Sequence, residues 1–282
     1  MPKTLEDLQS ELLELVAQTL AKTDLSNLRQ VSRECYVKTD RVWASAHFTT
    51  LRLVLGFDQS LQRGLEISRN HQFGRLVRDI KILTDRFDGG EDIADATTML
   101  EGQHIWRFFE VQYSQIEMKK YGRDLLFLGT IFSGLENART MRIATATVKD
   151  AGEDDEPLVV GFPHCHALLD VPTGSSSYSL TTIFDALCFS QLRISCLQID
   201  SNDMMLNMIG CMSERQYELC LSVFEHLKIL SLKFVVGVED HVNWYFGVDE
   251  LLGAALESVN RLEQLTVDFR TYPRDDEPSE LS

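Results

Sequence analysis

Hydrophobic and polar positions alternate with the period of an α-helix near the start of the chain. A first helix is predicted to begin close to Ser10, because serine often caps helix N-termini and the apolar positions after it share one helical face. After a polar break, Asp24 is expected to cap a second helix, and a third, weaker helical pattern follows. The apolar positions of the three helices are Leu12, Leu13, Val16, Ala17 and Leu20, then Leu25, Leu28, Val31 and Cys35, then Val37, Val42, Trp43 and Ala46.

These first helices contain more leucine than a unit of their size can bury. Domains below about 40 residues usually need a disulfide, a metal or a partner to be stable. Cys35 is the only one of the six cysteines in this part of the sequence, so no disulfide can form within it. The surplus apolar side chains therefore predict a docking surface, which another protein or the rest of the chain would cover.

A six-residue pattern, apolar-x-x-apolar-x-apolar, recurs in the rest of the chain. Its last two apolar positions alternate as on a short β-strand, and helical patterns precede four of the five occurrences. The strand patterns occupy residues 77–82, 138–143, 194–199, 227–232 and 262–267, and the helices are expected at residues 125–135, 180–191, 214–225 and 248–259.

A helix followed by a strand, repeated along the chain, is typical of a leucine-rich-repeat-like solenoid. Because the spacing is irregular, we expect a degenerate α/β solenoid with long insertions; a plain α/β sheet with helices on one side is the alternative. Loops are expected at residues 148–157 and 171–178. The predicted domains are a helical module at 1–46, a degenerate leucine-rich-repeat-like α/β domain at 47–270 and an acidic disordered tail at 271–282.

Composition and charge narrow the class of function. The chain has 282 residues, is 44% hydrophobic and carries a formal net charge of −16. A strongly acidic surface repels phosphate groups, which argues against a nucleic-acid partner. No apolar run approaches the roughly 18 residues that cross a bilayer, and the N-terminus lacks a signal-peptide pattern. We therefore expect no membrane association and a location in the cytoplasm or nucleus.

Candidate chemistry is sparse in this sequence. His164, Cys165 and His166 form a metal-like cluster, but neighbouring side chains point apart on a strand and no other pair completes four ligands. Asp200 and Asp203 follow an apolar strand pattern, and capping the next helix is a simpler role for them than catalysis. We expect no catalytic residue, no metal and no cofactor.

Aromatic residues cluster at two places. Residues 106–109 are expected to lie in the core rather than to anchor a partner, although tryptophan, tyrosine and arginine dominate interface hot spots. Tyr113, nearby, is a surface candidate. Residues 244–246 are all aromatic and are expected in a loop, where exposure is harder to explain by packing.

The order of residues in the first helices resembles an F-box. That family's pattern combines a leucine, Glu-Leu-Leu, an aliphatic residue, a second leucine, Asp-Leu, Leu-Arg and Val-Ser-Arg. The matching residues here are Leu8, Glu11, Leu12, Leu13, Val16, Leu20, Asp24, Leu25, Leu28, Arg29, Val31, Ser32 and Arg33. Gln9 stands where the family usually has proline, and Cys35 stands where a tryptophan often ends the motif.

The resemblance implies a substrate-recognition subunit of an SCF-type cullin-RING ubiquitin ligase, which is not itself an enzyme. The N-terminal helices would dock on a Skp-type adaptor, which joins the cullin scaffold, and the C-terminal domain would hold an unidentified protein target. Two other classes stay open: a non-ligase protein-interaction scaffold whose N-terminal helices cap the solenoid, and an enzyme of unrecognised type. The residues expected to bear the adaptor contact, or the packing beneath it, are Leu8, Leu12, Leu13, Val16, Leu20, Leu25, Leu28 and Val31.

Overall fold

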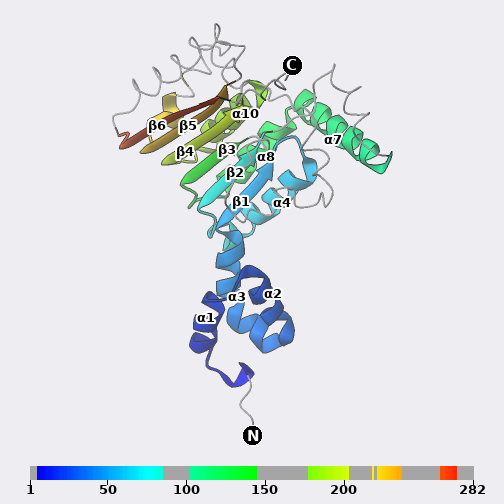
Figure 1. The fold of residues 1–282 in the computed structure, drawn as a ribbon, viewed down its shortest axis with the longest axis vertical. Helices are drawn as coiled ribbons and strands as arrows, with labels where there is room; N and C mark the ends of the chain where they lie inside the picture. Colours follow the sequence, from blue (N-terminus) through cyan, green and yellow to red (C-terminus); the bar gives the residue numbers. More distant parts are fainter. Residues whose placement is uncertain are drawn as a thin grey trace, which may run out of the picture.

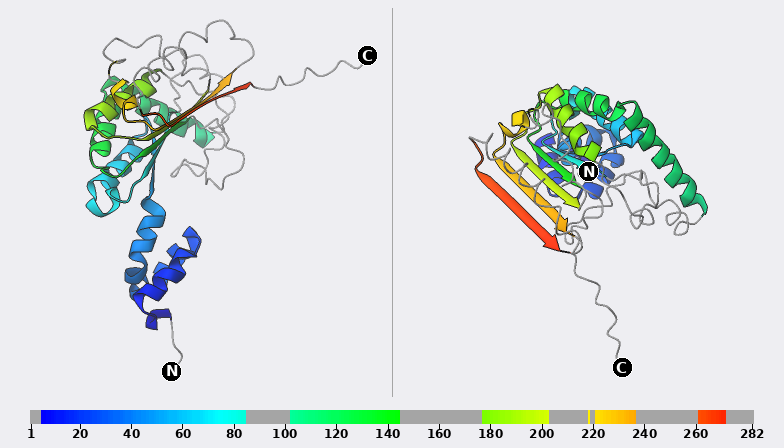
Figure 2. Two further views of the ribbon diagram at one scale, coloured as in Figure 1. Left: turned by 90° about the vertical axis from the view of Figure 1, so that its left-hand side faces the viewer. Right: turned by 90° about the horizontal axis from the view of Figure 1, so that it is seen from above.

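The computed structural model of the chain describes residues 5–84, 102–144, 177–202, 218, 221–236 and 261–271. It is a mixed α/β fold in which a small group of N-terminal helices extends away from a six-stranded parallel sheet (Figure 1). Helices cover one face of this sheet (Figure 2). The α/β class predicted from the sequence is therefore confirmed.

Three helices form what we call the N-terminal module. After a short 3-10 helix at Leu5–Asp7, they are α1 (Ser10–Gln18), α2 (Lys22–Val31) and α3 (Arg33–Phe48). Two predicted caps are wrong in position. Ser10 is already inside α1, whose N-cap is Gln9, and Asp24 lies in the first turn of α2, after its N-cap Ala21. A carboxylate in the first turn still interacts favourably with the helix dipole, so Asp24 supports α2 without capping it.

Six parallel strands follow, and each pairs with the next strand in the sequence. The chain therefore advances across the sheet in one direction, and every connection must cross over the sheet because the strands are parallel. The strands are β1 (Thr50–Val54), β2 (Asp79–Leu83), β3 (Thr140–Ala144), β4 (Cys196–Asn202), β5 (Ile229–Val236) and β6 (Gln264–Thr271).

The register of the sheet repeats the six-residue pattern of the sequence. The predicted strand segments coincide with β2–β6, and β1 was missed although Phe48, Leu51 and Leu53 fit the same pattern. The last two apolar positions of the pattern form two continuous rows across the sheet. These rows are Leu51, Ile80, Met141, Leu197, Leu230 and Leu265, and Leu53, Ile82, Ile143, Ile199, Leu232 and Val267.

All the strands after β1 start with the same hydrogen bonds. The Thr49 carbonyl accepts from the backbone N–H groups of Arg78 (2.8 Å) and Asp79 (3.1 Å), and the Lys228 carbonyl accepts from Glu263 (2.8 Å) and Gln264 (3.0 Å). This paired arrangement recurs at every junction between neighbouring strands, so it is the structural counterpart of the repeated sequence pattern. The carbonyls that accept in this way belong to Thr49, Arg78, Arg139, Ser195 and Lys228.

The described helices of the α/β domain are α4 (Asp58–Arg69), α5 (His71–Gly74), α7 (Gly102–Lys120), α8 (Arg123–Ser133) and α10 (Ser177–Ser190). The helices predicted at 125–135 and 180–191 coincide with α8 and α10. Residues 221–224 of the helix predicted at 214–225 are helical, and the helix predicted at 248–259 lies outside the described residues.

The predicted loops and tail fall mostly outside the described residues. Residues 148–157 are wholly outside, and the end of the loop predicted at 171–178 belongs to α10, which starts at Ser177. Thr271 ends β6, and the rest of the predicted tail is outside the described part.

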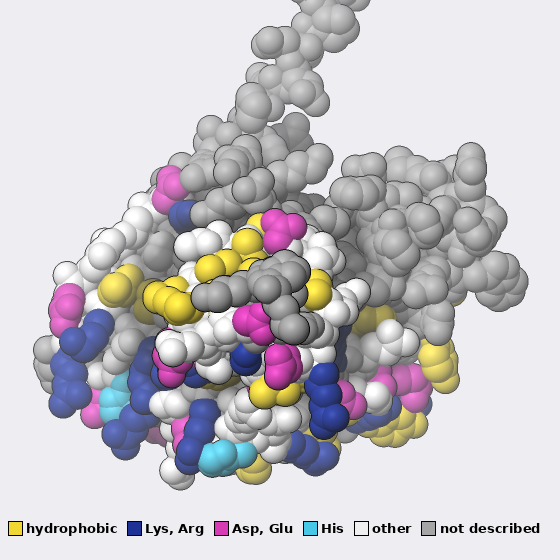
Figure 3. Space-filling model, turned by 90° about the horizontal axis from the view of Figure 1, so that it is seen from below, with side chains coloured by type: hydrophobic (Ala, Val, Ile, Leu, Met, Phe, Trp, Pro, Cys, Tyr) yellow, Lys and Arg dark blue, Asp and Glu magenta, His cyan; other side chains and the backbone are white. Residues whose placement is uncertain are grey.

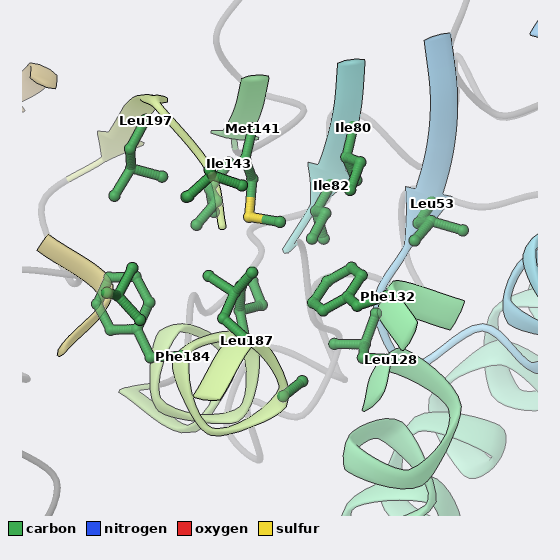
Figure 4. Packing of buried hydrophobic residues seen from close by; sticks show 14 of the residues in the cluster. Leu53, Ile80, Ile82, Leu128, Phe132, Met141, Ile143, Phe184, Leu187 and Leu197 are labelled. Carbon is green, nitrogen blue, oxygen red and sulfur yellow. The ribbon is translucent and has the colours of Figure 1, made fainter. Parts of the chain in front are cut away.

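The core of the α/β domain lies between the sheet and its helix layer. Leu128 and Phe132 of α8 and Phe184 and Leu187 of α10 point toward the apolar rows of the strands (Figure 4). Phe184 also meets Phe224 edge to face, with ring centroids 5.9 Å apart. These contacts explain why the predicted helical patterns are strongly apolar on one face.

The module joins the sheet through the end of α3. Phe48, the last residue of α3, stacks on Phe73 of α5 with ring centroids 4.2 Å apart and planes 8° from parallel. The Gln72 amide also donates to the Asp40 carboxylate at 3.3 Å. The predicted domain boundary at residue 46 lies in the last turn of α3, just before this junction.

Candidate docking surface on the N-terminal module

The N-terminal module has a small core of its own. Its buried members come from all three helices, and the amphipathic face of α3 completes it with Val42, Trp43 and Ala46. The buried residues are Leu13, Ala17, Leu25, Leu28 and Cys35, and the partly buried residues packed against them are Leu8, Leu20, Val42, Trp43 and Ala46.

Two polar contacts fix which face of α1 points inward. The Arg41 guanidinium pairs with the Glu14 carboxylate at 2.6 Å, and the Lys38 ammonium donates to the Leu8 carbonyl at 3.0 Å. Both join α3 to the N-terminal part of the chain. With Glu14 turned toward α3, the face of α1 that enters the core is that of Leu13 and Ala17.

Arg29 links α2 to α3 from a buried position. Its guanidinium carbon lies 3.8 Å from the centroid of the Tyr36 ring and 4.3 Å from that of Trp43. One nitrogen also donates to the Asp40 carboxylate at 2.9 Å. The stacking and the ion pair together explain why an arginine is tolerated almost without exposure. The sequence motif contains Arg29, but only the aromatic and acidic residues of α3 indicate its structural role.

Polar groups also set the start and the end of α3. The Ser32 hydroxyl accepts from the Cys35 N–H at 3.1 Å and thereby caps the helix, which accounts for the serine in the Val-Ser-Arg motif. Near the other end, the His47 ring nitrogen lies 3.4 Å from the Ser26 hydroxyl. Partial burial, followed by the positive charges of Lys22 and Arg29, lowers the pKa of His47.

The eight residues predicted to serve adaptor binding fall into three groups. Leu13, Leu25 and Leu28 are buried in the module, so their side chains are already covered. Leu8 and Leu20 are partly buried. The remaining three are Leu12, Val16 and Val31, which are 48%, 42% and 65% exposed.

Sequence reasoning missed further exposed apolar residues on the module. Leu15 is exposed and lies three residues after Leu12, so Leu12, Leu15 and Val16 are neighbours on the surface of α1. We call these three residues the α1 stripe. Tyr36 and Val37 in the first turns of α3 are also exposed. Figure 3 views this end of the molecule, where hydrophobic side chains lie among acidic and basic ones.

Asp200 is not a helix-capping residue, and the prediction that it caps a helix is wrong. It lies within β4 at 1% exposure. The Arg142 guanidinium of β3 donates to it at 2.7 Å, and the Gln198 amide donates to both of its oxygens. Asp200 is therefore part of a buried ion pair between neighbouring strands. Asp203, like the cluster of residues 164–166, lies outside the described residues.

The expectation that residues 106–109 lie in the core is wrong for Phe109, the member of that set whose side chain the structure describes. Phe109 and Tyr113 are both exposed on α7. The side chains of residues 106–108 and the aromatic residues 244–246 lie outside the described set.

Within the described ranges, no group of three or more His, Cys, Asp or Glu side chains is arranged to hold a metal ion. None of the helices described is both long and apolar enough to cross a membrane. A scan against protein-family models gives no match to the chain, and no curated protein matches it.

Proposed function

We propose that the chain is the substrate-recognition subunit of an SCF-type cullin-RING ubiquitin ligase. Its N-terminal module docks on a Skp-type adaptor, and its α/β domain, a degenerate leucine-rich-repeat-like solenoid, holds a protein target. The chain performs no chemistry in this role. It raises the effective concentration of a target lysine near the ubiquitin-charged enzyme.

The observation that carries the proposal is the α1 stripe. Leu13 and Ala17 close the core of the module, which leaves Leu12, Leu15 and Val16 in contact with water. Single exposed apolar residues are ordinary, but a contiguous set is typical of an interaction site. Burying one leucine side chain is worth roughly 1.5–3 kcal/mol, so several together can support an interface after the cost of association.

The α/β domain supports the second half of the proposal. Consecutive parallel strands and the repeated hydrogen bonds at their starts are features of repeat architectures. Side chains between the two apolar rows point to the opposite face of the sheet. They are polar on all six strands: Arg52, Lys81, Arg142, Gln198, Ser231 and Thr266. A row of this kind suits a protein target better than a lipid or an apolar ligand.

The position of the module argues against the alternative in which it caps the solenoid. A cap would lie along the edge strand β1. In Figures 1 and 2, α1 and α2 extend away from the sheet, and only α3 approaches it. This arrangement favours docking over capping.

The test is a binding measurement with a purified Skp-type adaptor. Leu12→Glu and Val16→Glu place charges in the α1 stripe without touching the core, and each should weaken adaptor binding at least about tenfold, an interface loss of about 1.4 kcal/mol. Leu126→Glu is the matched control, because Leu126 is also an exposed leucine on a helix, in this case α8. No binding by the natural chain, or equal binding by Leu12→Glu and Leu126→Glu, would contradict the proposal.

A further inference from the structure

A basic residue stands at the start of every strand after β1. In each of the five occurrences of the six-residue pattern, a lysine or arginine directly precedes or follows the first apolar residue. The ten positions that flank these apolar residues hold five basic side chains and one acidic one, although acidic residues outnumber basic ones by 43 to 27 in the whole chain. The five basic side chains are all exposed, and we call them the basic edge: Arg78, Arg139, Arg193, Lys228 and Arg261.

The register of the sheet places these residues in one row. Arg78, Arg139 and Lys228 occupy equivalent positions, because each supplies the carbonyl that accepts the first two N–H groups of the next strand. Arg193 and Arg261 lie two residues earlier, before β4 and β6. Neighbouring strands lie about 4.7–4.9 Å apart. The row therefore crosses the sheet from β2 to β6 with one cation at each strand.

Four of the five basic side chains form no ion pair within the described part of the chain. The side chains of Arg193 and Arg261 have neither a hydrogen bond nor an ion pair there. Arg78 donates to a backbone carbonyl at 3.3 Å, and Arg139 donates to two backbone carbonyls at 2.7 and 3.1 Å. A neutral carbonyl fixes the position of a guanidinium group but leaves its charge in place.

Acidic residues at the same junctions compensate only part of this charge. Glu263 pairs with Lys228 at 2.8 Å, and Glu136 pairs with a further exposed arginine at 3.7 Å. Asp79 and Glu225 are the other acidic residues there. The junctions, at residues 75–79, 136–140, 192–196, 225–229 and 261–264, thus contain six basic and four acidic residues. The result is a net positive edge on a chain of net charge −16.

The basic edge lies at the end of the sheet from which the N-terminal module extends. Helix α3 ends at Phe48 and β1 begins at Thr50, so the module leaves the sheet at the edge where the strands start (Figure 1). Figure 3 looks at this end of the molecule, and Lys and Arg side chains lie around the module in that view. A protein that docks on the α1 stripe therefore approaches from the side of the basic edge.

We propose that the basic edge binds an acidic surface of the same protein that docks on the α1 stripe. The inference rests on the proposed function, in which that protein is the Skp-type adaptor, and it adds the chemistry of a second contact. Single exposed ion pairs are weak, so the row acts as a set. A partner already held on the α1 stripe presents its carboxylates to the row at a high effective concentration.

The position and the charge of the edge select this occupant over two others. A nucleic acid long enough to follow the row continues past it and meets the field of a chain of net charge −16, which repels phosphate groups. A second copy of the chain carries the same net charge and has no second contact that would hold it at this edge. A protein anchored on the α1 stripe has such a contact.

The test measures the affinity of the full chain for a purified Skp-type adaptor at about 50 and about 500 mM salt. Arg193→Glu combined with Arg261→Glu should weaken binding at least about tenfold at low salt and much less at high salt, because salt screens exposed charges. Arg193→Lys combined with Arg261→Lys keeps both charges and should keep the affinity. Arg63→Glu combined with Lys120→Glu is the matched control, since it makes the same change in net charge at exposed positions on α4 and α7.

An uncharged variant separates the two contacts. Leu12→Ala removes apolar surface from the α1 stripe without changing charge, so it should weaken binding by the same factor at both salt concentrations. Circular dichroism should show the same helix content in all variants.

The outcomes distinguish the two proposals. A natural chain that does not bind the adaptor contradicts the proposed function and the inference with it. Adaptor binding that the charge reversal at Arg193 and Arg261 leaves unchanged, or that the matched control weakens equally, overturns the inference alone. Self-association of the chain, or its saturable binding of a single-stranded oligonucleotide, would also overturn the inference if the same charge reversal abolished it, because another occupant would then hold the edge.

Discussion

The guanidinium of Arg29 lies 3.8 Å from the centre of the Tyr36 ring, and this contact holds α2 against α3. Asp40 and Trp43 complete the surroundings of the same side chain. Because α3 also continues to the sheet, the contact between Arg29 and Tyr36 helps to fix the orientation of α2 relative to the α/β domain. The position of the candidate docking surface therefore depends on a residue that is itself buried.

Arg29→Ala should lower the free energy of unfolding by about 2 kcal/mol, since it removes a ring-stacked cation and one partner of an ion pair. Arg29→Lys should recover only part of that loss, because lysine keeps the charge but cannot stack as a plane. Urea unfolding followed by circular dichroism measures both. Arg33→Ala is the matched control on the exposed first turn of α3. Equal losses from Arg29→Ala and Arg33→Ala would contradict the assigned role.

Removing Arg142 should be more harmful than removing an arginine at the surface. Asp200 would then keep a buried carboxylate that accepts hydrogen bonds from the neutral Gln198 amide but has lost the positive charge of Arg142, and breaking such a pair usually costs about 3–5 kcal/mol. We expect Arg142→Ala to approach the lower end of that range, because Arg142 itself retains some exposure. Arg193→Ala, which removes an exposed arginine before β4, should change the unfolding free energy by less than about 0.5 kcal/mol.

The lowered pKa of His47 makes stability depend on pH. The folded state holds the proton of this ring less tightly than the unfolded chain, whose histidine has the usual pKa of 6.5. Its contribution is therefore complete above pH 6.5 and is lost as the pH falls toward the folded pKa. Denaturant midpoints at pH 7.5 and 6.0 should differ less in His47→Gln than in the natural chain. His71→Gln, at an exposed position on α5, should leave the difference unchanged.

Gly129 lies within α8 and Gly134 caps its C-terminal end, and replacing each of them by alanine should change the stability of the protein differently. A Cβ on Gly134 would lie 2.6 Å from the Ser68 backbone oxygen, which cannot move without shifting α4. Gly134→Ala should therefore cost about 1–3 kcal/mol through overpacking. A Cβ on Gly129 would meet only the ring of Phe189, an exposed side chain that can turn away. Gly129→Ala should be neutral or stabilising, because alanine favours the helix by about 1 kcal/mol. Thermal melts of the two variants separate these outcomes.

The sequence predicted the later strands better than the first because of what precedes each strand. The patterns at β2–β6 stand apart from their surroundings, whereas Phe48 belongs both to the helical pattern of α3 and to the strand pattern of β1. Only one residue, Thr49, lies between the two elements. No glycine or proline marks the change, and the two threonines at positions 49 and 50 are too short a polar break to end the helical pattern, so periodicity alone hides the strand.

The sequence pattern placed exposed apolar residues on the first helices but did not identify which of them are exposed. Leu12 and Leu13 are adjacent apolar residues, and a rotation of about 100° around the helix axis exchanges their roles. What decides between them is the contact of Glu14 with Arg41, a residue 27 positions away in the chain. Long-range pairs of this kind leave no local signal. For the same reason, the pattern of α7 could not reveal that Gln112 and Gln115 are buried while Phe109 and Tyr113 are exposed.

Deleting residues 1–46 distinguishes a docking module from a cap. The shortened chain keeps Phe48 and therefore its stacking on Phe73, and loses the contact between Asp40 and Gln72. Because the module meets the sheet through the end of α3, we expect the remaining chain to stay folded and monomeric, with a cooperative thermal transition. Adaptor binding should be lost completely. An aggregated or non-cooperative product would instead mean that the first helices cover the start of the sheet, and would favour the capping role.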